Sequence, residues 1–227
     1  DNNKRYAGAD FTLTVTGAVS LNGVTLGAGG HQGGAIDSLA VGPAGATLYG
    51  DTVGLTAASD LQLETAAVRA SGDLSLVSTS GSISTAYGAD QEVRSTSGKL
   101  TVNAGANLNN AGLMIAEGGN ADFTAGGLLS NSKLLLALGA LKVTAASVAN
   151  TAAGAISGLD SLAMTTTTGK ILNQGRLYAG NELTVPADTT GKTGLFTNKG
   201  EIRSGGDVVL TADTFVNNRL IDANQDI

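Results

Sequence analysis

The sequence has no cysteine, no tryptophan, two prolines and one histidine among its 227 residues. Without cysteine no disulfide can form, a composition that fits a secreted protein avoiding misoxidation and equally fits a cytosolic one. A zinc site needs several His, Cys or suitably placed carboxylate ligands, so we interpret His31, which has Gly and Gln as neighbours, as a solvated loop residue. Metal chemistry is therefore not expected.

Charge and long apolar runs are also scarce. The net charge is -6, and the 13 Lys and Arg residues are scattered singly along the chain. This distribution predicts no basic face for phosphate contacts, so nucleic acid is not an expected partner. The longest apolar stretches, such as residues 134–138, are far shorter than the ~20 residues that a membrane-spanning helix needs. We expect a chain that does not span a membrane.

Catalytic motifs are missing as well. The sequence contains neither a Gly-x-Ser-x-Gly elbow nor the Gly-Gly-x-Gly-x-Asp pattern of calcium-binding repeats. One enzyme alternative stays open: a polysaccharide-cleaving β-helix in which Asp160, Glu182 and Asp207 align along one face. Only eight aromatic residues are available as sugar platforms, and most acidic residues precede apolar ones at expected turns. We predict that the protein is not an enzyme and uses no cofactor.

What the chain does contain is glycine, small residues and short alternating apolar patterns. There are 33 Gly, hydrophobic residues make up 42% of the chain and charged residues 14%, which predicts a folded chain of strands and turns. A motif of the form apolar-x-apolar recurs at start-to-start steps of 20 to 26 residues, and five of the seven steps lie within one residue of 21. The motif occurs at residues 53–55, 74–76, 100–102, 121–123, 141–143, 162–164, 183–185 and 208–210.

A second series, of asparagines, has a similar spacing at another phase. It comprises Asn110, Asn131, Asn150, Asn173, Asn198 and Asn217. Three of them begin an Asn-x-Gly triplet, and an apolar residue usually follows four positions after the Asn. Two interpretations remain open for this Asn column: an internal ladder of amides, or turn residues that face solvent.

Together the two series predict an all-β solenoid. Short strands that recur every 21 residues cannot bury their own apolar face, but stacked turns of a parallel β-helix can do so. About ten coils, ~4.8 Å apart, would form a rod roughly 50 Å long. Leu183 and Leu210 are expected to point inward.

We expect residues 1–227 to be a single shaft segment. Residues 51–227 hold regular repeats with insertions at 81–97 and 187–194, and residues 1–50 hold less regular coils. Within the latter, residues 27–34 are interpreted as a loop or a looser coil. Because the chain starts at Asp1 without a Met or an apolar leader, and both ends lie within repetitive sequence, we expect a piece of a longer protein.

Residues 110–125 and 173–185 resemble the filamentous haemagglutinin repeat, whose units have the form Leu-x-Asn-x-Gly-x-Leu, a small turn, then Leu-x-Leu-x-Ala. The resemblance covers residues 98–227 well and residues 50–97 more loosely. It implies a right-handed parallel β-helix in a large exoprotein of Gram-negative bacteria, exported through a partner outer-membrane transporter. Members include adhesins, haemolysin-like proteins and effectors of contact-dependent growth inhibition. The Asn-Pro-Asn motifs of the secretion domain are absent, which is typical of the shaft downstream of it.

The function predicted from this resemblance is a structural shaft. It would belong to a secreted or cell-surface protein and project an adhesive or toxic region from the bacterial surface. In the alternative, the segment is itself the adhesin and binds a host receptor, a glycan or a target bacterium through its insertions. The candidate binding residues are then Tyr87, Asp90, Glu92, Arg94 and Lys192.

Overall fold

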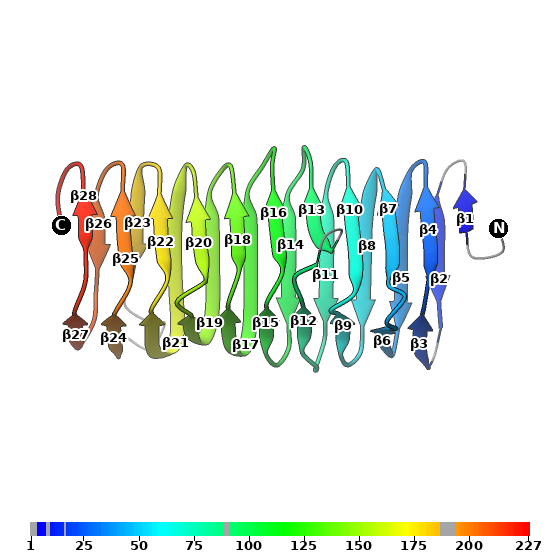
Figure 1. Ribbon diagram of the computed structural model, residues 1–227, viewed down its shortest axis with the longest axis horizontal. Helices are drawn as coiled ribbons and strands as arrows, with labels where there is room; N and C mark the ends of the chain where they lie inside the picture. The colour runs from blue at the N-terminus through cyan, green and yellow to red at the C-terminus, as the bar shows by residue number, and fades with distance from the viewer. Residues whose placement is uncertain (1–3, 8–9, 16, 89–90, 187–193) are drawn as a thin grey trace.

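The protein is a straight rod of stacked β-strand turns. The computed structural model describes residues 4–7, 10–15, 17–88, 91–186 and 194–227. These residues form 28 strands and no helix, and the two ends of the chain lie at opposite ends of the rod (Figure 1). No long apolar helix of the kind that crosses a membrane occurs in this described part of the chain.

Each turn contributes one strand to a first face, which is a parallel sheet of eleven strands. In stacking order these are β1 (Lys4–Ala7), β4 (Val24–Ala28), β7 (Ala46–Gly50), β10 (Ala66–Ala70), β13 (Glu92–Ser95), β16 (Leu113–Ala116), β18 (Leu134–Ala137), β20 (Ala155–Gly158), β22 (Arg176–Ala179), β25 (Glu201–Ser204) and β28 (Ile221–Ala223).

The second face is also a parallel ladder, in which each strand bonds to its counterparts one turn away. It comprises β2 (Phe11–Thr14), β5 (His31–Ile36), β8 (Thr52–Ala57), β11 (Leu74–Ser78), β14 (Leu100–Ala104), the first halves of β17 (Ala121–Asn131), β19 (Leu141–Asn150) and β21 (Ser161–Asn173), then β23 (Glu182–Val185) and β26 (Val208–Leu210).

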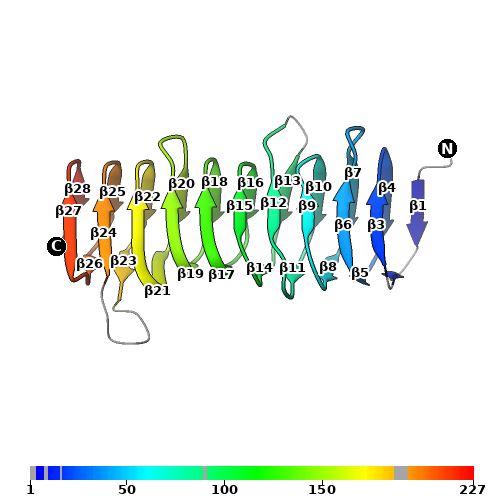
Figure 2. The same ribbon diagram turned by 90° about the horizontal axis from the view of Figure 1, so that it is seen from below.

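The third face, which Figure 2 shows from below, continues from the second. In the middle of the rod three long strands cross the corner between the two faces, with a register shift in the β17–β19 and β19–β21 pairings. The face consists of β3 (Ala18–Leu21), β6 (Ser38–Val41), β9 (Leu61–Leu63), β12 (Ile83–Thr85), β15 (Leu108–Asn110), the second halves of β17, β19 and β21, then β24 (Leu195–Asn198) and β27 (Thr214–Asn217).

The recurring apolar motif lies in one column of the second face. Val53, Leu74, Leu100, Ala121, Leu141, Leu162, Leu183 and Val208, the first residues of the eight motifs, are successive Cα partners. One 21-residue period is therefore one turn of the solenoid, which confirms the predicted all-β parallel stack.

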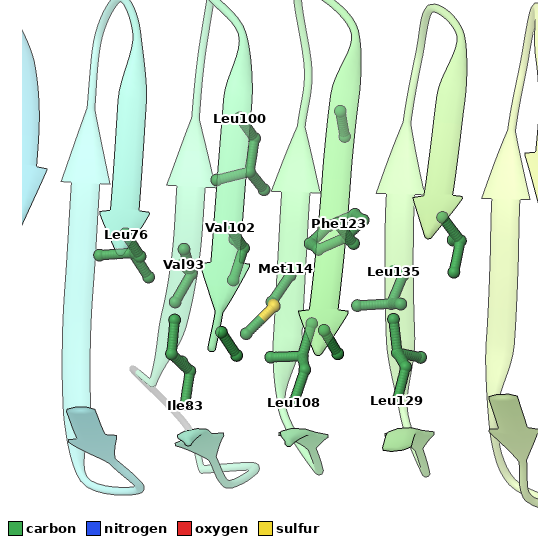
Figure 3. Close-up of a cluster of buried hydrophobic side chains, with 14 of the residues drawn as sticks. Leu76, Ile83, Val93, Leu100, Val102, Leu108, Met114, Phe123, Leu129 and Leu135 are labelled. Atoms are coloured by element: carbon green, nitrogen blue, oxygen red, sulfur yellow. The ribbon is translucent and has the colours of Figure 1, made fainter. Parts of the chain in front are cut away.

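The space between the three faces is filled by apolar side chains. Figure 3 shows Met114 and Leu135 of the first face pointing toward Val102 and Phe123 of the second and Leu129 of the third. All five side chains are at most 1% exposed. Leu183 is fully buried, as expected, whereas Leu210, near the last turn, is only partly buried.

The interpretation of residues 27–34 as a loop is wrong, because they lie largely within β4 and β5. Gln32 and Gly34 pair with Val53 and Leu55 of the next turn and take the same inward phase. Gln32 is 1% exposed. A polar residue and a glycine at inward positions interrupt the apolar pattern, but the backbone ladder continues through them. His31 is thus an exposed strand residue, and its Nδ1 lies 2.7 Å from the Thr52 hydroxyl.

The two expected insertions differ from the prediction in extent. Residues 81–97 contain β12 and β13, so only residues 86–91 connect strands where a residue pair does so in the next turn. Four additional residues there account for most of the 26-residue step. Of the second insertion, residues 187–193 lie outside the described residues.

Candidate functional site

The Asn column runs along the corner that follows the third face. Each side-chain amide donates to the next: Asn110 Nδ2 to Asn131 Oδ1 at 2.7 Å, then onward at 2.9, 2.8, 2.8 and 2.8 Å as far as Asn217. Thr85, one turn before Asn110, donates its hydroxyl hydrogen to Asn110 Oδ1 at 2.7 Å. The first five asparagines are at most 2% exposed, and Asn217 is exposed at the end of the rod.

The remaining hydrogen-bonding capacity of these amides is also used. The second N–H of Asn110 donates to the Leu134 carbonyl at 3.1 Å, and that of Asn173 donates to the Glu201 carbonyl at 3.1 Å. The Asn198 side-chain oxygen accepts from the Gly200 N–H at 3.2 Å. Buried amides with all donors and acceptors satisfied stabilise a corner and have no group left for a ligand.

The structure separates the candidate binding residues of the first insertion. Tyr87, on the 86–91 connection, is 59% exposed and packs on the Lys133 ammonium, 4.0 Å from the ring centroid. Glu92 and Arg94 belong to β13, on the outer side of the first face. Asp90 and Lys192 lie outside the described residues.

Glu92 and Arg94 are part of an ion-pair network that crosses three strands. Glu92 pairs with Arg69 of β10 at 2.7 Å and with Arg94 at 2.6 Å, and Arg94 also pairs with Glu117 just after β16. Burial raises the pKa of Glu92, but hydrogen bonds and charges from Arg94 and Arg69 outweigh burial, so the pKa lies below its ordinary value. The network ties neighbouring turns together.

The three carboxylates of the enzyme alternative do not form one row. Asp160 stacks beneath Asn181, whose Nδ2 donates to Asp160 Oδ1 at 2.7 Å, while Glu182 is the partner of Ser161. Asp207 accepts from the backbone N–H of Asp226 at 3.1 Å. Asp60 and Asp73 likewise accept from backbone N–H groups one turn on. Within the described ranges, no group of three or more His, Asp or Glu side chains could hold a metal ion.

Sequence analysis missed a groove on the outer side of the first face. It has a volume of about 400 Å³ and is lined by Ala155, Ser157, Arg176, Leu177, Tyr178, Glu201 and Arg203. A second depression of about 340 Å³ shares Arg176 and Glu201 and adds Lys199 and Arg219. Cations that are scattered singly in the sequence are therefore gathered here. The spacing of Arg176 and Arg203, close to the repeat period, was the available signal.

The haemagglutinin repeat family matches residues 92–227, which is more than half of the chain. The chain belongs to the haemagglutinin repeat family. The matched repeats begin at the first residue of β13 and contain the whole Asn column and both depressions. No curated protein and no solved structure shows a significant match to this haemagglutinin repeat chain.

Proposed function

We propose that this segment is a rigid shaft that projects an adhesive or toxic region of a larger exoprotein away from the bacterial surface. The observation that carries the proposal is the in-register stacking of the first face, which continues through eleven parallel strands from β1 to β28. A shaft needs length and stiffness, and both follow from this arrangement.

Stiffness has two sources in the structure. Backbone hydrogen bonds run parallel to the rod axis on three faces, so bending the rod would stretch bonds along one side. The buried Asn column adds a fourth line of hydrogen bonds at a corner. Length increases by about 4.8 Å with each added turn, and the eleven strands of the first face span about 48 Å.

Membership of the haemagglutinin repeat family supports the cellular setting of the proposal. We infer a secreted or cell-surface exoprotein of a Gram-negative bacterium, exported through a partner outer-membrane transporter. The distal region would be an adhesin or a contact-dependent inhibition effector. The enzyme alternative has less support, because Asp160 is out of register with Glu182.

The experiment removes whole turns from the exoprotein in the bacterium that makes it. Leu100 and Leu183 occupy the same column four turns apart, so deletion of residues 100–182 keeps the register. The shaft proposal predicts a purified rod about 19 Å shorter in small-angle scattering. It also predicts surface labelling and distal activity close to those of the full-length protein.

The matched control deletes residues 100–172, which joins a second-face corner to the end of the third face and breaks the register. This variant should fail to fold or to reach the surface. If the in-register variant reaches the surface but loses distal activity, the residues of the segment matter beyond its length, and the shaft proposal is wrong.

A further inference from the structure

The groove on the first face arises from a change in side-chain size along two outward columns. In one column Leu134, Ala155 and Arg176 are successive partners, and in the other Leu136, Ser157 and Tyr178 are. Small residues on β20 thus lie between leucines on β18 and long side chains on β22. The result is a depression one strand wide, with an aliphatic wall on one side and an aromatic and cationic wall on the other.

The cations of this wall are only loosely paired. The side chains of Arg176 and Arg203 are 75% and 51% exposed, and their Nε atoms lie 3.5 and 3.9 Å from the same Glu201 oxygen. A guanidinium has five N–H donors, so most of them remain directed toward solvent. Both arginines can bind an anionic group in bidentate geometry.

Positive charge extends beyond the groove into the adjoining depression. Lys199 and Arg219 line that depression, and both are exposed. Four of the 13 cationic residues of the chain therefore lie around two joined depressions, in a protein of net charge -6. Their acidic neighbours are Glu201 and Asp222, the latter paired in register with Arg203.

Tyr178 gives the groove an aromatic surface beside these cations. It is 38% exposed and lies next to the small Ser157, so one side of the ring is accessible from the groove. Tyrosine presents an apolar ring face together with a polar hydroxyl. A flat sugar ring that carries an acidic group matches this combination, because the ring can stack on Tyr178 while the acid binds the arginines.

We propose that this groove binds an acidic polysaccharide, with carboxylate or sulfate groups on Arg176 and Arg203 and a sugar ring on Tyr178. Acidic polypeptides offer the charge without the ring, so they fit the groove less well. The site lies on the flat face of the rod and does not depend on the shaft function, since the deletion experiment above tests length and export alone.

The test measures binding of the intact 227-residue chain to immobilised polysaccharides. Dextran sulfate and hyaluronan present sulfate and carboxylate groups respectively, unmodified dextran is the neutral control, and polyglutamate is the polypeptide control. We expect binding to dextran sulfate, hyaluronan or both, and the tighter one identifies the preferred acid group. Arg203→Glu should weaken binding at least about tenfold, and Tyr178→Ala about fivefold.

Lys170→Glu is the matched control, because it makes the same charge change at an exposed position of β21, outside the first face. It should change affinity less than about twofold. Equal losses for Lys170→Glu and Arg203→Glu would mean non-specific charge attraction. An unchanged affinity for Tyr178→Ala, equal binding of polyglutamate, or no binding to either acidic polysaccharide would also overturn the proposal. Melting temperatures of all variants show whether each remains folded.

Discussion

At the scale of single residues, the Asn column shows how a polar side chain becomes part of a core. An amide removed from water costs free energy unless its donors and acceptors are bonded. Asn150 accepts from Asn131 and donates to Asn173 and to the Arg176 carbonyl. Each amide is thus satisfied by the turns on both sides, and its contribution depends on its neighbours in the column.

Replacement of an internal member should therefore cost more than replacement of the last one. Asn150→Ala leaves the Asn131 Nδ2 donor and the Asn173 oxygen without their partner, each at about 1–3 kcal/mol, so we expect a loss of about 3 kcal/mol in unfolding free energy. Urea denaturation measures this loss.

Asn217→Ala is the matched control for that prediction. Asn217 is exposed and accepts from Asn198 at the end of the ladder. Water can replace this partner, so the loss should stay below about 1 kcal/mol. Equal losses at Asn150 and Asn217 would contradict a cooperative internal ladder.

The residue scale also shows what sequence reasoning could reach. The asparagines were found because one residue type recurs at one phase. The groove was not found, because its lining residues differ in type and become neighbours only once the register of three turns is known. Steps that vary from 20 to 26 residues hide which outward positions share a column.

At the scale of strands and corners, the Asn-x-Gly triplets place glycine where adjacent turns come closest. A Cβ at Gly200 would collide with the backbone of Gln174 and Gly175 in the preceding turn. Backbone atoms held in two ladders cannot move aside cheaply. Gly200→Ala should therefore destabilise the protein by about 2 kcal/mol or more, measured by urea denaturation.

Gly17→Ala provides the comparison, because a Cβ at Gly17 meets no atom within 4 Å. That substitution should be neutral or slightly stabilising, since alanine restricts the unfolded chain. The corner argument fails if the two alanine variants are equally stable.

The ion-pair network between β10, β13 and β16 predicts a dependence of stability on pH. Because the pKa of Glu92 is lowered in the folded state, the carboxylate stabilises the fold above its unfolded pKa, about 4.3. That stabilisation is lost as the pH falls through the lower, folded pKa. We expect the melting temperature of Glu92→Gln to change less than that of the unmodified protein between about pH 5 and pH 2.

Glu182→Gln is the control for the pH experiment, because it removes the same charge at an exposed position of β23, outside the network. Its melting profile should follow that of the unmodified protein. If Glu92→Gln and Glu182→Gln give superimposable profiles, the network does not carry the predicted linkage.

Strand prediction succeeded wherever inward positions are apolar and failed where they are not. From Val53 to Val208 the motif marks every turn of the second face. In β5, Gln32 and Gly34 occupy inward positions, so alternation gave no signal although the ladder continues. In β13, the charged residues Glu92 and Arg94 point outward and made a strand look like part of an insertion.

At the scale of the whole molecule, stability should depend on the position of a turn along the rod. Each turn contacts only its neighbours, so an internal turn is covered on both sides and the last turn on one. Phe196 and Phe215 illustrate the difference, because they are partners in one column with ring centroids 5.3 Å apart. Phe196 is 2% exposed and Phe215 is 42% exposed.

The same substitution at these two positions should therefore have unequal effects in the 227-residue chain. We expect Phe196→Ala to cost about 3–5 kcal/mol and Phe215→Ala about 1 kcal/mol, measured by urea denaturation. Hydrogen exchange tests the same gradient, since amides of β27 and β28 should exchange well before those of β14 and β17. Uniform protection along the rod, or equal losses at the two phenylalanines, would mean that the turns unfold as one unit rather than from the exposed end.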